Sequence, residues 1–101
     1  MKYHSVRTWS DLCQRWFPSK AEARRGEELH LLQRAGEITD LEYQVKFVLS
    51  IAPKVTITLD FGYKENGQQV YEDVKGFLTR DFRTKMAWLK EKFGIEVRLV
   101  R

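Results

Sequence analysis

The dipeptide Asn66-Gly67 is the feature that most constrains how this chain folds. It separates residues 54–65, in which apolar side chains alternate with threonine, aspartate and glycine, from residues 68–77, which are expected to form a second strand. Asn-Gly between two such segments is the preferred two-residue turn of a β-hairpin. The sequence therefore predicts an antiparallel hairpin with a fixed register.

That register places two acidic residues opposite each other. Counting outward from the turn, Asp60 faces Asp73, and the side-chain period of two puts Lys75 on the same face. Opposed carboxylates with Cβ atoms about 5 Å apart repel each other, which destabilises a bare sheet. A divalent cation between them reverses the sign of the interaction, so the pair predicts a metal site.

Each acid also has a structural explanation, and these alternatives stay open. Asp60 could be an edge residue that discourages aggregation, and Asp73 could form a salt bridge with Lys75 or Lys64. A longer turn or a β-bulge would separate the two acids.

Composition restricts the class of protein. With 101 residues the chain is expected to be one domain. Its 43% hydrophobic and 32% charged residues are typical of a soluble globular protein, and no apolar run is long enough to span a bilayer. A net charge of +4 permits binding to a polyanion. The single cysteine, Cys13, suits a reducing cytoplasm, and no P-loop or dinucleotide motif indicates a small-molecule cofactor.

Residues 1–16 are expected to form an N-terminal amphipathic segment that precedes the main domain. Trp9, Leu12, Cys13 and Trp16 follow helical spacing, which predicts a short amphipathic helix over residues 8–16. Such a helix would pack on the core of its own domain, or it would be an exchanged arm that builds a dimer.

The remaining residues, 17–101, are expected to form one α/β domain. Helical and strand periodicity predict the order α-β-β-β-α-β, which gives a mixed central sheet of about four strands flanked by helices. Thr79 is the expected N-cap of the second helix, and Gly94 is expected to end it. Besides the hairpin, the predicted elements are helices at 20–35 and 80–93, strands at 42–49 and 95–100, and a connection at 50–53.

Glu22 has two explanations. Ser19-Lys20-Ala21-Glu22 is a capping box, which accounts for a glutamate without any chemistry. Glu22 also borders the predicted buried stripe of its helix, where it could join a catalytic site. The residues alone leave these alternatives open.

In this order, the motifs resemble the PD-(D/E)xK, or restriction-endonuclease-like, superfamily. The resemblance rests on the helix that carries Glu22, on Leu59-Asp60-Phe61, and on Asp73-Val74-Lys75-Gly76. It is closest to small phage proteins related to endonuclease I-type Holliday junction resolvases, and covers roughly residues 17–100. Leu59 stands where the superfamily often has proline.

The resemblance implies a role for each residue of the motif. Asp60 and Asp73 would bind the metal, together with the main-chain carbonyl of Val74 and with Glu22, and Lys75 would be the lysine of the motif. Glu22, Asp60, Asp73 and Lys75 would then be the catalytic residues.

We therefore expect a DNA endonuclease that uses Mg²⁺ or Mn²⁺, acts on branched DNA, forms a homodimer, and works in the cytoplasm (the host's, if phage-encoded). The alternatives are an inactive DNA-binding or assembly module with the same fold, and a structural phage protein whose acids face solvent. The expected DNA contacts are Lys20, Arg24, Arg25, Gln44, Thr79, Arg83 and Lys85.

Overall fold

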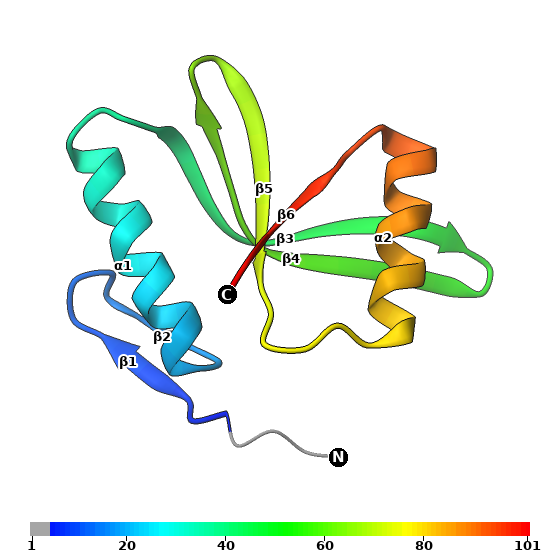
Figure 1. The fold of residues 1–101 in the computed structure, drawn as a ribbon, viewed down its shortest axis with the longest axis horizontal. Coiled ribbons are helices and arrows are strands. Elements are labelled where there is room, and N and C mark those ends of the chain that lie inside the picture. Colours follow the sequence, from blue (N-terminus) through cyan, green and yellow to red (C-terminus); the bar gives the residue numbers. More distant parts are fainter. Residues whose placement is uncertain (1–4) are drawn as a thin grey trace.

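Two helices stand at opposite ends of a four-stranded sheet in the computed structural model, which describes residues 5–101 (Figure 1). The strand order is β3-β4-β5-β6, with β3, β4 and β5 antiparallel and β6 parallel to β5. The predicted α/β fold and the order α-β-β-β-α-β are confirmed. The elements are β1 Thr8–Ser10, β2 Arg15–Phe17, α1 Lys20–Arg34, β3 Thr39–Ile51, β4 Lys54–Glu65, β5 Gln68–Val74, α2 Arg80–Phe93 and β6 Val97–Val100.

The hairpin of β4 and β5 has the predicted turn and register. Glu65 pairs with Gln68, and both Asn66 and Gly67 have positive φ, as a turn of this kind requires. Strand β5 ends at Val74, three residues earlier than expected, and β3 is longer than predicted at both of its ends. The caps of α2 are also as predicted, because Thr79 accepts a hydrogen bond from the Phe82 amide and Gly94 adopts the left-handed conformation.

Strand β4 contributes to both hydrophobic clusters of the molecule. Its first half, with Ile57 and Leu59, packs in the cluster that includes Leu89 of α2. Its second half, with Phe61 and Tyr63, packs in the cluster that includes α1 residues. Asp60 lies between the two halves.

The predicted helix over residues 8–16 is wrong. Residues 8–10 and 15–17 form the antiparallel hairpin of β1 and β2, in which Trp9 pairs with Trp16. Their rings meet edge to face with centroids 5.6 Å apart, and Gln14 in the connecting turn has φ 55°. Two tryptophans seven residues apart satisfy helical spacing, but aromatic side chains also favour strands, and here the cross-strand pair is the stable arrangement.

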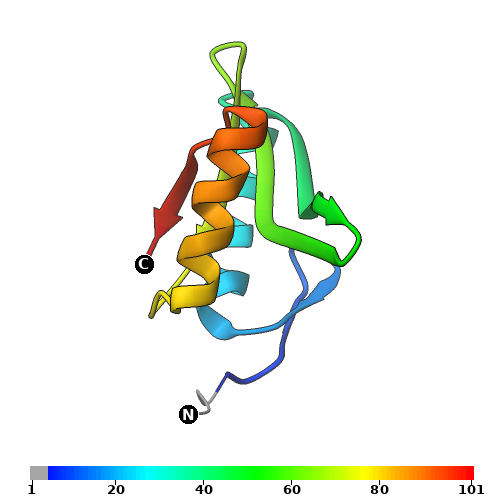
Figure 2. The same cartoon turned by 90° about the vertical axis from the view of Figure 1, so that its right-hand side faces the viewer.

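This hairpin packs on α1 of its own chain (Figure 1), whereas Figure 2 views the molecule from the side of α2. Phe17 is buried in the core, and its ring lies so close to Gly26 that a Cβ there would be 2.6 Å from Phe17 Cζ. Ser10 is also buried and donates a 2.6 Å hydrogen bond to Glu27. The segment is thus built into the domain; residues 1–4 of the predicted N-terminal segment lie outside the described residues. Within residues 5–101, neither helix is long and apolar enough to cross a bilayer.

Candidate active site

The opposed aspartates are held together by the main chain of their two strands. The Asp60 amide donates a 3.0 Å hydrogen bond to Asp73 Oδ1, and the Val74 amide donates a 2.8 Å hydrogen bond to Asp60 Oδ2. Asp73 is 1% exposed, while Asp60 is partly buried. Both carboxylates are therefore fixed by backbone geometry, with little freedom to move apart.

Lys75 lies on the same side of the site, as predicted. Its Nζ is 3.2 Å from Asp73 Oδ2 and 4.2 Å from the centroid of the Phe82 ring. Among the described residues, none makes a well-aligned hydrogen bond to Asp73 Oδ2, although this oxygen is buried. Within residues 5–101, Lys75 is thus the one positively charged group that pairs with this carboxylate oxygen.

The two explanations of Glu22 can now be separated. Ser19 Oγ accepts the Glu22 amide at 3.1 Å, which is one half of the capping box. The Glu22 carboxylate does not make the reciprocal bond to Ser19; it accepts a 2.9 Å bond from Gln44 Nε2 and lies close enough to Asp60 to interact with it electrostatically. Glu22 is 6% exposed. Its amide serves the helix cap, while its carboxylate belongs to the acidic cluster.

Burial and mutual repulsion raise the pKa values of all three acids. Desolvation, followed by the charge of Glu22, raises the pKa of Asp60 to about 6. Desolvation, followed by the charge of Asp60, raises the pKa of Asp73 to about 6. The pKa of Glu22 is also raised, mainly by burial. Without added positive charge, the cluster is held in an unfavourable ionisation state at neutral pH.

Gln44 lies across from Asp60 on β3. Its two neighbours, Tyr43 and Val45, pair with the two neighbours of Asp60, and Gln44 has φ 53° inside the strand. A non-glycine residue in this conformation costs energy, and such residues gather at functional sites. Contact of Gln44 with DNA stays a prediction; in the structure its side chain holds the Glu22 carboxylate.

The oxygen donors suit a hard divalent cation. Among residues 5–101 no three His, Cys, Asp or Glu side chains are spaced to hold a metal ion by themselves. Magnesium is nevertheless commonly bound through one or two carboxylates, with water and substrate phosphate supplying the rest. Asp60 and Asp73 fit that arrangement, because a buried oxygen of Asp73 lacks a hydrogen bond. Glu22 would complete the donor set through water, and the Val74 carbonyl remains a predicted ligand.

A third buried acid, Glu72, was not predicted from the sequence. Glu72 is 0% exposed and is bound in bidentate fashion by Arg25, with Nε–Oε1 2.9 Å and Nη2–Oε2 2.8 Å. Tyr63 donates a short hydrogen bond to the same carboxylate, and Arg98 approaches it at 3.9 Å. Because side chains alternate along β5, Glu72 lies on the sheet face opposite Asp73. It therefore belongs to the core beside α1 and not to the acidic cluster.

The predicted DNA contacts are placed differently. Arg25 binds Glu72 and Glu28 within the protein, so its guanidinium is not available to contact a DNA phosphate as predicted. Lys20, Arg24 and Arg83 are exposed, and Lys85 is paired with Asp81 at 3.4 Å. Thr79 lines a pocket of about 490 Å³ together with Lys75, next to the acidic cluster.

Fold and site together define an α/β domain in which two aspartates on central strands lie beside a helix glutamate and a lysine that follows the second strand. The chain belongs to the DUF1064 family, described as a protein of unknown function, whose model matches residues 2–100. No curated protein and no solved structure gave a significant match.

Proposed function

We propose that this protein is a metal-dependent DNA endonuclease of the PD-(D/E)xK type. The observation that carries the proposal is the convergence of Glu22 from α1, Asp60 from β4, and Asp73 from β5 with Lys75, which directly follows that strand. A structural role explains this cluster poorly, because the raised pKa values mean that packing three acids together opposes folding at neutral pH.

The chemistry is hydrolysis of a phosphodiester. Water adds to phosphorus while one P–O ester bond breaks, and the proton lost by the water balances the one gained by the leaving oxygen. Asp60 and Asp73 would hold Mg²⁺ or Mn²⁺, which supplies charge neutralisation and an activated water when bound. Lys75, next to Asp73, is placed to donate to a water or to a phosphate oxygen, where charge builds during the reaction.

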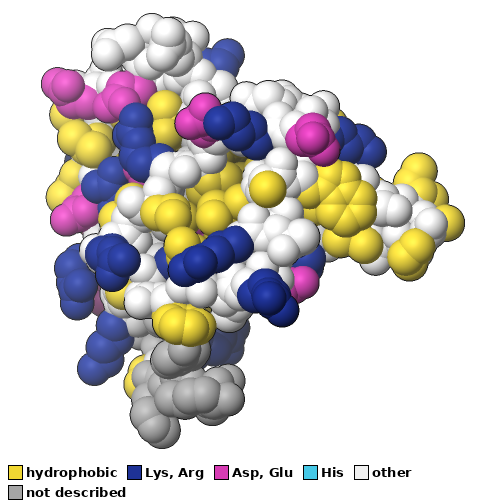
Figure 3. Space-filling model, turned by 45° about the vertical axis from the view of Figure 1, so that its right-hand side comes forward, with side chains coloured by type: hydrophobic (Ala, Val, Ile, Leu, Met, Phe, Trp, Pro, Cys, Tyr) yellow, Lys and Arg dark blue, Asp and Glu magenta, His cyan; other side chains and the backbone are white. Residues whose placement is uncertain are grey.

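The charge of the surface suits a nucleic-acid substrate. Lysine and arginine side chains spread over the lower half of the face in Figure 3, whereas acidic ones lie mainly near its upper edge. The helix N-termini marked by Ser19 and Thr79 both line the pocket with Lys75, and such N-termini favour phosphate. Cutting both strands of a four-way junction needs two sites, so we further propose a symmetric dimer. A cytoplasmic location follows from a DNA substrate and agrees with a single cysteine.

The test is cleavage of labelled DNA by the intact protein. Four-way junction, duplex and single-stranded DNA are incubated with Mg²⁺, with EDTA, and with the variant Asp73→Asn. Asp40→Asn is the matched control, because Asp40 is an exposed aspartate whose one ion pair within residues 5–101 is with Lys64, at 3.7 Å. We expect cleavage that requires Mg²⁺, is lost in Asp73→Asn and is retained in Asp40→Asn.

Cleavage that survives Asp73→Asn would reject the proposed site. DNA binding without cleavage of any substrate in Mg²⁺ or Mn²⁺ would favour an inactive binding or assembly module with this fold. Mass measurement in solution, with and without junction DNA, tests the dimer.

A further inference from the structure

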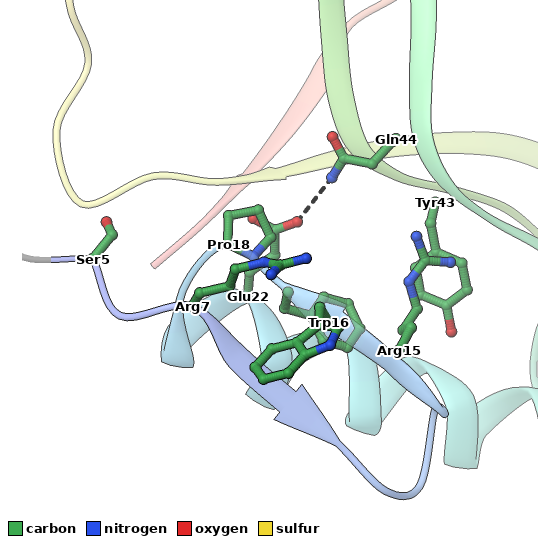
Figure 4. A pocket seen from close by; sticks show the side chains of 9 residues that line it. Ser5, Arg7, Arg15, Trp16, Pro18, Glu22, Tyr43 and Gln44 are labelled. Carbon is green, nitrogen blue, oxygen red and sulfur yellow. Dashed lines mark hydrogen bonds between the residues drawn. The ribbon is translucent and has the colours of Figure 1, made fainter.

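A pocket of about 520 Å³ lies between the N-terminal hairpin and the acidic cluster. Figure 4 shows Arg15 against Tyr43 on one side of it and Arg7 beside Trp16 on the other, with Gln44 reaching toward Glu22. Its size is within the range of about 300–1,000 Å³ that is usual for sites that bind small molecules or single groups.

Flat cationic and aromatic groups line this pocket. The Arg7 guanidinium carbon is 4.7 Å from the centroid of the Trp16 ring, and that of Arg15 is 3.9 Å from the centroid of Tyr43. Neither arginine forms an ion pair with a residue in the range 5–101. Arg15 Nε is buried and has no hydrogen-bond partner within that range. The pocket therefore offers stacking surfaces and unused N–H donors together.

The pocket is continuous with the candidate active site. Glu22 belongs both to its wall and to the acidic cluster, and Gln44 donates to Glu22 from the opposite wall. The smaller pocket that holds Lys75 adjoins it, because Ser5 lines both pockets. A strand bound along both pockets would thus meet Trp16 in one and Thr79 in the other.

We propose that the hairpin pocket binds an unpaired nucleotide next to the phosphodiester that is cut. The base stacks on the surface formed by Trp16 and Arg7, and the Arg15 guanidinium, which is itself held against Tyr43, binds its phosphate. The inference rests on the proposed nuclease function and deepens it, because it makes DNA with single-stranded character the preferred substrate class.

The chemistry of the walls favours this occupant. Exposed aromatic rings beside guanidinium groups are the combination that proteins use to bind single strands, since every base has a π-face and every linkage a negative charge. An apolar ligand would leave the donors of Arg7 and Arg15 without partners. A paired duplex would not present an unstacked base to Trp16, which is 49% exposed.

The test measures binding of a fluorescein-labelled 15-mer single strand, its blunt duplex and a forked duplex by anisotropy in EDTA, which prevents cleavage. Trp16→Leu is expected to bind the single strand and the fork about 5- to 100-fold more weakly, the range seen when one stacking aromatic is removed. Trp16→Tyr should restore most of the affinity. Trp88→Leu is the control, because Trp88 is partly exposed on α2, away from the pocket. Thermal melting checks that each variant folds.

Arg15→Met gives an independent measurement, with Arg34→Met as the control for one lost charge on an exposed arginine. Arg15→Met is expected to weaken single-strand binding clearly more than Arg34→Met does. Equal effects of pocket and control variants, or unchanged binding in Trp16→Leu, would overturn the inference.

The two proposals can fail separately. Cleavage that depends on Asp73, with single-strand binding unchanged in Trp16→Leu, would reject the strand pocket and keep the nuclease. Binding that depends on Trp16, with no cleavage of any DNA, would keep the pocket and reject the nuclease.

Discussion

Replacing Asp60 with asparagine is expected to stabilise the metal-free protein while abolishing cleavage. Asp60 is partly buried beside Glu22 and Asp73, and its negative charge opposes folding. Asparagine has the same shape, and its carbonyl oxygen can still accept the 2.8 Å hydrogen bond from the Val74 amide. The substitution therefore removes charge repulsion and keeps the main-chain contact.

The magnitude follows from the pKa of Asp60, which rises from 3.8 to about 6 on folding. A shift of one unit corresponds to about 1.4 kcal/mol, so the penalty at neutral pH is at most about 3 kcal/mol. Part of this free-energy penalty is shared with Glu22 and Asp73, and water near the partly exposed Asp60 carboxylate reduces the penalty further. We therefore expect a gain of about 1–2 kcal/mol, which raises Tm by at least about 4 °C in a domain of this size.

The pH dependence of Tm provides a second test that the Asp60 charge opposes folding. Because the pKa of Asp60 is higher in the folded state, protonation favours folding below about pH 4, and this contribution is lost as pH rises through about 6. The asparagine side chain of the variant does not titrate. The difference in Tm between the variant and the natural protein should thus be small at pH 4 and largest above pH 7.

The assay is thermal unfolding between pH 4 and 8 in EDTA, repeated in Mg²⁺. Asp40→Asn is the control, since Asp40 is exposed and its φ of 55° is one that asparagine tolerates. Mg²⁺ should raise the Tm of the natural protein above that in EDTA and have less effect on Asp60→Asn, because a ligand stabilises only the state that binds it. A Tm for Asp60→Asn that is lower than that of the natural protein at pH 7.5, or a difference that does not change with pH, would refute the reasoning.

Three further predictions concern other parts of the molecule. Lys75→Met should lower the cleavage rate by about 100-fold or more, as removal of one group that stabilises charge in the transition state does, but should keep the rise of Tm in Mg²⁺. Arg25→Met should lower the free energy of unfolding by about 3 kcal/mol in urea titration, because the buried Glu72 carboxylate loses its bidentate partner and keeps Tyr63 and the more distant Arg98; adding Glu72→Gln should recover part of the loss. Gly26→Ala should cost about 1–3 kcal/mol in the same titration despite the better helix propensity of alanine, because its Cβ would lie 2.6 Å from Phe17; an unchanged stability would mean that the hairpin is loosely packed.

Local signals account for the parts of the fold that could be predicted. Asn66-Gly67 defined one hairpin and Thr79 capped one helix, and both signals act over a few residues. Trp9 and Trp16 carry no such signal, because a spacing of seven places two side chains on one helix face and can also place them opposite each other in a hairpin. The packing of Phe17 against Gly26 decides between these alternatives, and that contact is not visible in local sequence.

In the candidate site, too, one part could be predicted from local sequence and another could not. A tight turn sets the register, so the approach of Asp60 to Asp73 could be predicted from sequence, whereas the partner of Glu22 could not. That partner is Gln44, which itself adopts a left-handed backbone conformation inside β3. Local sequence does not favour this conformation for glutamine, and it occurs here where β3 pairs with β4.

The position of Asp60 between two hydrophobic clusters explains how the fold tolerates an acidic site. Leu59 on one side and Phe61 on the other are both fully buried, in separate clusters that pack against different helices. The strand is thus anchored on each side of the carboxylate, so repulsion between Asp60 and Asp73 cannot be relieved by moving the backbone. Since the acids cannot separate, a divalent cation bound beside Lys75, as we propose, would lower their energy further without protonation, and the repulsion that opposes folding would then contribute to affinity for the ion.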